Sequence, residues 1–211
     1  MNILYQDRRA LVIDKPAGLP VHPGRAGGAS VEDEFPRWRQ GKQGPWLAHR
    51  LDTDTAGCLV IALKKSFLLE AQALFAAGRV EKTYWAVVAG VPAMRAGVIE
   101  QPLAKHTKGR SWKMAPDPAG ERAVTEYRVL GDDGAVALVE FRPKTGRTHQ
   151  IRAHAAALGH PIIGDAVYGG GAGRLHLLAR HIRLPLDAPV EATAPIPAHM
   201  HEKVEACGGA L

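Results

Sequence analysis

The chain has 211 residues and a formal net charge of +6 at pH 7, with an isoelectric point near 9.5. This length can bury a core in one domain or two closely joined lobes, and the charge favours a polyanionic partner. The two cysteines, Cys58 and Cys207, supply neither a disulfide framework nor a zinc site. No apolar run reaches the roughly 20 residues that span a bilayer, and no signal-peptide core begins the chain. We therefore expect a cytoplasmic protein without membrane association.

The first predicted strand is the run Leu11-Val12-Ile13, and Asp14-Lys15-Pro16-Ala17-Gly18 is the turn that ends it. The stretch from Gly24 to Gly44 combines glycines with a tryptophan and four cations, namely Trp38, Arg25, Arg37, Arg39 and Lys42. It is either a basic surface for nucleic acid or a solvated loop with a short helix. The residues alone do not separate these two interpretations.

A lone carboxylate, Asp52, stands two residues after Arg50 and shortly before the apolar run 56–62, which has strand character. The point at which a loop enters a sheet is a common place for a catalytic group. An acid in this position can also serve only to solubilise the surface or to cap a turn. Residue chemistry by itself leaves both interpretations open.

The next two elements are a helix and a strand. Apolar residues at helical spacing predict an amphipathic helix over 66–77, with Ser66 as its N-cap and Gly78 as its end. Aromatic and β-branched residues predict a strand over 80–90, in which Tyr84 and Trp85 face opposite sides. By itself, Tyr84 is either a packed sheet residue or a residue of a binding site.

A basic segment follows over 103–114, where four cations surround one aromatic residue: Lys105, Lys108, Arg110, Lys113 and Trp112. Cations on a loop beside an aromatic ring suit an RNA backbone and a stacked base. The alternative is an exposed hairpin tip that is charged for solubility, and we favour RNA contact. Beyond it, two alternating runs, 123–130 and 135–141, flank Gly131-Asp132-Asp133-Gly134 and predict a β-hairpin.

The segment 144–168 predicts a helix over 147–158 that ends at Gly159. His149 and Arg152 are three residues apart and share one side of it. Three histidines, His149, His154 and His160, raise the question of a metal site. Their spacing lacks the i, i+4 pair and the glutamate of a helical zinc motif. We therefore expect structural histidines and no metal.

Four stretches together resemble the RluA-type RNA pseudouridine synthases. The opening has the form ILYxD followed by LVIDKPAGLPVHPG, and His49-Arg50-Leu51-Asp52 precedes Thr55-Ala56-Gly57, where the family has HRLDxxTSG. A third stretch places Lys-x-Tyr, with Tyr84, ahead of Ala-Val-Val-x-Gly. The segment 144–168 matches TGRTHQIRxHxxxLGHPIxGDxxY. Two positions depart from the family pattern. Ala56 stands where the family has Ser, and Thr53, the second departure, borders Asp52 and can affect substrate preference.

The resemblance implies an α+β protein with the pseudouridine synthase fold, in which helices flank a mixed, mainly antiparallel sheet with a central active-site cleft. It implies one catalytic domain over residues 1–211. Because the family's opening stands at residue 3, no N-terminal S4-like domain is expected in front of it. No cofactor or metal is implied, and a monomer is the default expectation.

The same resemblance implies the roles of individual residues. Asp52 is the nucleophile that attacks the ribose or the uracil ring, or the base in a route through a ribose-derived intermediate. Arg152 pairs with it and keeps it ionised, Arg50 helps to displace the base, and Tyr84 stacks on the uracil and can take the proton from carbon 5. Weaker candidates for lining the pocket are Arg147 and Leu177.

The implied substrate is a structured stem-loop of ribosomal or transfer RNA, because the target nucleotide must leave its stack to be reached. The RNA contacts are assigned to Lys105, Lys108, Arg110 and Trp112. Two other classes are weaker. A non-catalytic RNA-binding domain gives no reason for the Asp52 motif, and a hydrolase that acts on nucleosides has no need of basic segments.

Overall fold

The computed structural model describes residues 1–24, 27–109 and 111–210. The chain forms two compact units, each assembled from two separate segments. Unit 1 consists of Met1–Lys82 and Ala179–Pro195, and unit 2 consists of Thr83–Leu178 and the residues from Ile196 onward. None of the helices in the described ranges has the length and apolar character needed to cross a bilayer.

Unit 1 is built on an antiparallel sheet in which β1 (Asn2–Gln6) pairs with β2 (Ala10–Lys15) and β2 pairs with β4 (Ala56–Ala62). All seven residues of β4 are buried, as expected of a strand that is apolar on both faces. β3 (Trp46–Leu47) pairs with the end of β4, and β12 (Val190–Thr193) pairs with the second half of β11 (Leu177–Leu184). The predicted strand at 11–13 and the predicted loop-to-strand position of Asp52 are both confirmed.

The helices of unit 1 are η1 (Val31–Glu34), α1 (Phe35–Trp38) and α2 (Lys65–Ala76). The buried residues of α2 are Phe67, Ala71 and Leu74, whose spacing of four and three residues forms one apolar stripe. The prediction of Ser66 as N-cap is wrong, because α2 begins one residue earlier and Lys64 holds that position without a side-chain cap. Gly78 ends the helix with a φ of +66°, the left-handed conformation that glycine adopts without steric cost.

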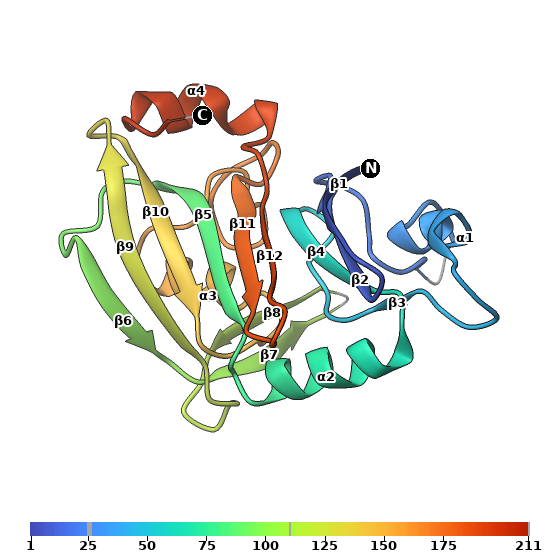
Figure 1. The fold of residues 1–211 in the computed structure, drawn as a ribbon. Coiled ribbons are helices and arrows are strands. Elements are labelled where there is room, and N and C mark those ends of the chain that lie inside the picture. Colours follow the sequence, from blue (N-terminus) through green and yellow to red (C-terminus); the bar gives the residue numbers. More distant parts are fainter. Residues whose placement is uncertain (25–26, 110, 211) are drawn as a thin grey trace. The chain divides into compact units, whose positions relative to one another are not determined.

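Unit 2 contains an antiparallel run of strands in the order β5-β10-β9-β6, seen side by side in Figure 1. Its strands are β5 (Glu81–Ala89), β10 (Val136–Pro143), β9 (Val124–Asp132) and β6 (Ala96–Glu100). The predicted strand at 80–90 and the predicted hairpin are confirmed, although β9 extends two residues into the expected turn. The shorter elements η2 (Ala198–Met200) and α4 (His201–Ala206) follow β12 in the chain.

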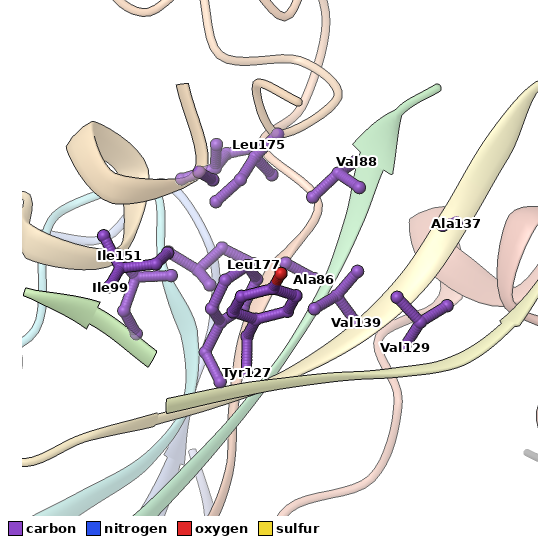
Figure 2. Packing of buried hydrophobic residues seen from close by; sticks show 13 residues of the cluster. Ala86, Val88, Ile99, Tyr127, Val129, Ala137, Val139, Ile151, Leu175 and Leu177 are labelled. Atoms are coloured by element: carbon purple, nitrogen blue, oxygen red, sulfur yellow. The ribbon is translucent and has the colours of Figure 1, made fainter. Parts of the chain in front are cut away.

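One hydrophobic cluster fills the side of this sheet that faces α3 (Gln150–Ala157). Figure 2 shows the Tyr127 ring among Leu177, Ala86 and Val139, with Ile151 of α3 close by. Strand residues two apart supply the cluster, as the pleat of a strand requires, and the helix closes it. The mainly antiparallel pairing and the packed helices confirm the predicted α+β class.

The structure corrects two predicted elements. The helix expected over 147–158 begins only at Gln150, because His149 adopts a left-handed conformation with φ 51° and ψ 21°. The segment 103–114, expected as a loop, is instead a separate antiparallel hairpin of β7 (Leu103–Lys108) and β8 (Ser111–Pro116). We call this element the β7–β8 hairpin.

Candidate active site

The segment around Asp52 is held in place by backbone hydrogen bonds within unit 1. The carbonyl oxygen of Asp52 accepts the N–H of Thr55 at 3.1 Å, which closes a turn just before β4. The carbonyl oxygen of Thr53 accepts the N–H of Gly18 at 2.9 Å. The chain on the C-terminal side of Asp52 is therefore fixed to the turn that follows β2.

A buried lysine strengthens this attachment. Lys15 is fully buried, and its Nζ donates hydrogen bonds to the carbonyl oxygens of Pro16, Leu19 and Thr53 at 2.8 to 2.9 Å. Burial lowers the pKa of Lys15 to about 8, although Asp54, Asp52 and Asp14 act in the opposite direction. An ammonium with three donors thus has three carbonyl acceptors, which is how a buried charge avoids a large desolvation penalty.

Sequence reasoning missed Lys15, which we assigned only to the turn that ends the first strand. A signal was present, because strand alternation places it on the same face as Leu11 and Ile13, and all three are fully buried. A lysine on the apolar face of a strand requires polar partners. The pattern did not indicate that those partners are the carbonyl groups around Asp52.

His49 fixes the other side of the Asp52 segment. Its Nε2 accepts the backbone N–H of Val60 in β4 at 3.0 Å, and its ring packs on Phe75 of α2 with centroids 4.8 Å apart. Burial lowers the pKa of His49 to about 3, and the charge of Lys82 acts in the same direction. The ring is therefore neutral near pH 7 and anchors the segment. Arg50 itself is exposed.

In unit 2, Arg152 forms a buried pair with Asp165. Its Nε and Nη2 donate to the two carboxylate oxygens at 2.7 and 2.8 Å, and the side chains are 7% and 0% exposed. Such a bidentate pair fixes the plane of the guanidinium. The sequence prediction named Asp52 as the partner of Arg152 and did not foresee Asp165. A guanidinium has five N–H donors, so one arginine can serve two carboxylates, and the pairing with Asp52 stays a prediction.

Tyr168 lies against the same arginine. Its ring centroid is 5.3 Å from the guanidinium carbon of Arg152, and its backbone N–H donates to Asp165 at 3.2 Å. Asp165 also accepts the N–H of Val167 at 3.1 Å. The turn 165–168 therefore holds Arg152 through both a carboxylate and an aromatic face. Sequence reasoning had not assigned a role to Asp165 or Tyr168.

Tyr84 and Leu177 share one environment in unit 2. Tyr84 is half-buried opposite Phe141 of β10 and packs against the cluster beneath α3. Leu177 is buried within that cluster, as Figure 2 shows. Trp85 lies opposite Glu140 and, by alternation along β5, faces the other side. Tyr84 is thus on the α3 side of the sheet, whereas its contact with a base and the pocket-lining role of Leu177 remain predictions.

The predicted RNA contacts lie on the β7–β8 hairpin. Lys105, Lys108 and Trp112 are exposed, and the Nζ of Lys105 is 4.8 Å from the Trp112 ring centroid. The Trp112 ring stacks on His149 with centroids 5.1 Å apart and an interplanar angle of 21°. Arg110 lies outside the described residues. Lys105 and Lys108 therefore lie on a paired strand, whereas a loop was expected for them.

Arg147 lies outside α3 and is exposed. It forms an ion pair with Glu121, and its Nε donates to the carbonyl oxygen of Arg122 at 3.1 Å. Glu121 in turn bonds to Leu103 at the start of the β7–β8 hairpin. Arg147 is therefore attached to the base of this hairpin, and its expected role in a pocket remains untested.

Two of the three histidines considered for metal binding, His154 and His160, contact oxygen atoms of the protein. His154 contacts Thr125 Oγ1 at 2.8 Å and the Gln101 carbonyl oxygen at 3.0 Å, and His160 Nδ1 contacts the Ala89 carbonyl oxygen at 2.9 Å. Within the described residues, no three histidine, cysteine or acidic side chains are grouped so as to hold a metal ion. The expectation of structural histidines is met at both positions.

A family model described as RNA pseudouridylate synthase matches residues 9–157, more than half of the chain, so the protein belongs to the RNA pseudouridylate synthase family. Members of this family are isomerases that convert uridine in RNA to pseudouridine. The family inferred from the four sequence stretches is confirmed.

Individual relatives agree with this family. The chain is 41% identical over 211 residues to an RNA pseudouridine synthase of Zymomonas mobilis, covering 93% of this chain and 94% of the relative. It is 35% identical over 198 residues to ribosomal large subunit pseudouridine synthase D of the same organism, covering 89% and 62%. The solved structure of human RNA pseudouridylate synthase domain containing 4 superposes with a TM-score of 0.84 at 29% identity, covering 100% of this chain and 94% of that one.

Proposed function

We propose that this enzyme isomerises specific uridines in structured RNA with the Asp52 carboxylate as its catalytic group. In the reaction the bond between N1 and the ribose C1′ breaks, the base turns, and a bond from C5 to C1′ forms. The proton on C5 leaves and N1 regains one, so no redox step or external energy is required. The observation that carries the proposal is the fixed backbone on both sides of Asp52, through Lys15 and Gly18 on one side and His49 on the other.

A fixed carboxylate suits every version of the chemistry, because an attacking group must be held close to its target. Asp52 acts as a nucleophile toward the ribose or the uracil ring, or as a base in a route through a ribose-derived intermediate. Arg152 would keep the carboxylate ionised, and its own plane is fixed by Asp165. No cofactor or metal is required by this isomerisation.

The remaining predicted residues would handle the base and the RNA. Tyr84 stacks on the uracil and takes the C5 proton, while Arg50, which is exposed, helps to displace the base from its stack. Arg147 and Leu177 would line the pocket. The whole chain, 1–211, would act as one catalytic domain and as a monomer.

The proposed substrate is a stem-loop of ribosomal or transfer RNA, which would place the enzyme in the cytoplasm. The net charge of +6 and the exposed cations of the β7–β8 hairpin support a polyanionic substrate. Two relatives are named ribosomal large subunit pseudouridine synthases, which favours ribosomal RNA. A loop nucleotide is the preferred target, because extrusion from a loop costs less than extrusion from a duplex.

Pseudouridine mapping of total RNA tests this proposal. RNA from cells that lack the gene is compared with RNA from cells complemented by wild type, Asp52→Asn or Asp54→Asn. Asp54 is a matched control, because it is an exposed acid of the same segment. We expect wild type and Asp54→Asn to restore the same sites and Asp52→Asn to restore none. Restoration by Asp52→Asn would contradict the assignment of Asp52.

A further inference from the structure

Two aromatic residues of unit 2, His149 and Tyr168, hold the β7–β8 hairpin at β8. The Trp112 ring stacks on the His149 ring at 5.1 Å. The hydroxyl oxygen of Tyr168 accepts the backbone N–H of Met114 at 2.9 Å. Trp112 and Met114 are two residues apart on one strand, so both contacts are made by the same short segment of β8.

The same two residues also hold Arg152. His149 immediately precedes α3 and stands three residues before Arg152, so its conformation sets where the helix begins. The Tyr168 ring lies 5.3 Å from the guanidinium carbon, and the Tyr168 N–H bonds to Asp165, the partner of Arg152. A displacement of the hairpin would therefore change the position of the Arg152 side chain through both residues.

His149 and Tyr168 are joined to each other. Their rings meet edge to face with centroids 5.9 Å apart, and His149 Nδ1 is 3.3 Å from the Tyr168 hydroxyl oxygen. Among the described residues, His149 is the only residue other than glycine with a positive φ. That conformation is strained for a residue with a Cβ and persists only where surrounding contacts enforce it. The stack with Trp112 and the contact with Tyr168 are such contacts.

We infer that His149 and Tyr168 are positioning residues, through which the docking of the β7–β8 hairpin sets the orientation of Arg152. The inference rests on the proposed function, in which the hairpin binds RNA and Arg152 serves Asp52. RNA that holds the hairpin in its docked position holds the arginine in its working orientation. Part of the hairpin's contribution then affects the rate of the chemical step and not only the affinity.

Single-turnover tritium release measures the two effects separately. The probe is total RNA labelled with [5-³H]uridine in cells that lack the gene, so the target is present whichever RNA carries it. Tritium leaves C5 when the new glycosidic bond forms. The rate at saturating enzyme reports the chemical step, and the enzyme concentration at half-maximal rate reports affinity. The proteins are wild type, Tyr168→Phe, His149→Asn, Trp112→Ala, the double variant Trp112→Ala with Tyr168→Phe, and Val167→Ala.

Tyr168→Phe keeps the ring on Arg152 and removes only the hydroxyl that bonds to β8. We expect it to lower the saturated rate about tenfold, a typical size for coupling between sites, and to change the half-saturating concentration less than about twofold. Trp112→Ala lowers both the rate and the affinity. The saturated rate of the double variant is no lower than that of Trp112→Ala alone, because the effects of substitutions at coupled residues do not add. Val167→Ala, a control with an exposed side chain in the same turn, keeps the wild-type rate.

Two results would overturn the inference: an unchanged saturated rate in Tyr168→Phe, or independent, multiplying losses in the double variant. If Tyr168→Phe fails to fold by circular dichroism, His149→Asn decides, since Asn tolerates the left-handed conformation and lacks the ring. Asp52→Asn, assayed in parallel, separates the two proposals. A wild-type rate in that variant would contradict the assignment of Asp52. The effect of His149 and Tyr168 on the saturated rate would still be measured by comparing their variants with wild type.

Discussion

The Nζ of Lys15 donates a hydrogen bond to the carbonyl oxygen of Thr53, the residue after Asp52, at 2.9 Å. Two further carbonyl groups, of Pro16 and Leu19, complete its partners. A buried cation thus joins the turn after β2 to the segment that presents Asp52. We therefore expect Lys15 to help fix the backbone next to Asp52.

Replacement of Lys15 by methionine tests this dependence. Lys15→Met keeps a similar volume and removes the charged donor from three carbonyl groups, of which that of Thr53 keeps the Gly18 N–H as a partner. Since hydrogen bonds to a charged group contribute about 1.5 to 3 kcal/mol, we expect the free energy of unfolding to fall by about 2 kcal/mol. Urea denaturation measures this, and Lys65→Met, at an exposed lysine of α2, serves as control. Equal stability of the two variants would show that Lys15 has no anchoring role.

The depressed pKa of His49 predicts a dependence of stability on pH. The folded value is about 3, and the ordinary value of histidine is 6.5, so between these pH values the unfolded chain binds more protons than the folded one. The contribution of His49 to the free energy of unfolding is therefore fully present above pH 6.5. It falls as the pH is lowered toward 3, by up to about 1.4 kcal/mol per pH unit.

Urea denaturation at a series of pH values isolates this contribution. His49→Gln retains an oxygen that can accept the Val60 N–H but does not titrate. Between pH 4 and 6 we expect the free energy of unfolding to depend less steeply on pH in the variant. The difference in slope should correspond to the uptake of close to one proton on unfolding. Burial also lowers the pKa of His154 and His176, so the variant keeps part of the slope. Identical slopes in both proteins would show that His49 is not held neutral.

The fold was predictable where residue spacing follows one element. Aromatic and β-branched residues along 80–90 and alternation along 123–141 predicted β5, β9 and β10. The start of α3 was not predictable, since the helical pattern continues to Arg147 while tertiary contacts hold His149 in a left-handed conformation. The β7–β8 hairpin was weighed only as the alternative to a loop, because its strands are polar and mostly exposed.

The site was predictable only as far as the family resemblance reaches. Asp52, Tyr84 and Arg152 came from matched motifs, and their roles stay predictions. Lys15 and Asp165 act through partners 38 and 13 residues away in the chain, so neither spacing nor propensity identifies those contacts. Buried charges of this kind need a folded structure to reveal which groups compensate them.

The buried Arg152–Asp165 pair should contribute far more to stability than an exposed one. Asp165→Asn leaves a buried guanidinium without its carboxylate, which typically costs 3 to 5 kcal/mol. The control is Glu81→Gln, which removes an ion pair with Arg183 whose side chains are 60% and 38% exposed and is expected to cost less than about 1 kcal/mol. Chemical denaturation measures both, and similar losses would show that the buried pair is not a stabilising contact.

The exposed lysines of the β7–β8 hairpin should affect RNA affinity through charge. Each Lys→Ala change at Lys105 or Lys108 removes about one phosphate contact, so the slope of log affinity against log salt should fall by about one for each cation. Filter binding of unmodified ribosomal and transfer RNA transcripts between 50 and 300 mM salt measures the slope. Lys65→Ala, at an exposed lysine of α2, is the control and should keep the wild-type slope. If Lys105→Ala and Lys108→Ala weaken binding equally at every salt concentration, the hairpin does not contact phosphates, and its role would be limited to the stack of Trp112 on His149.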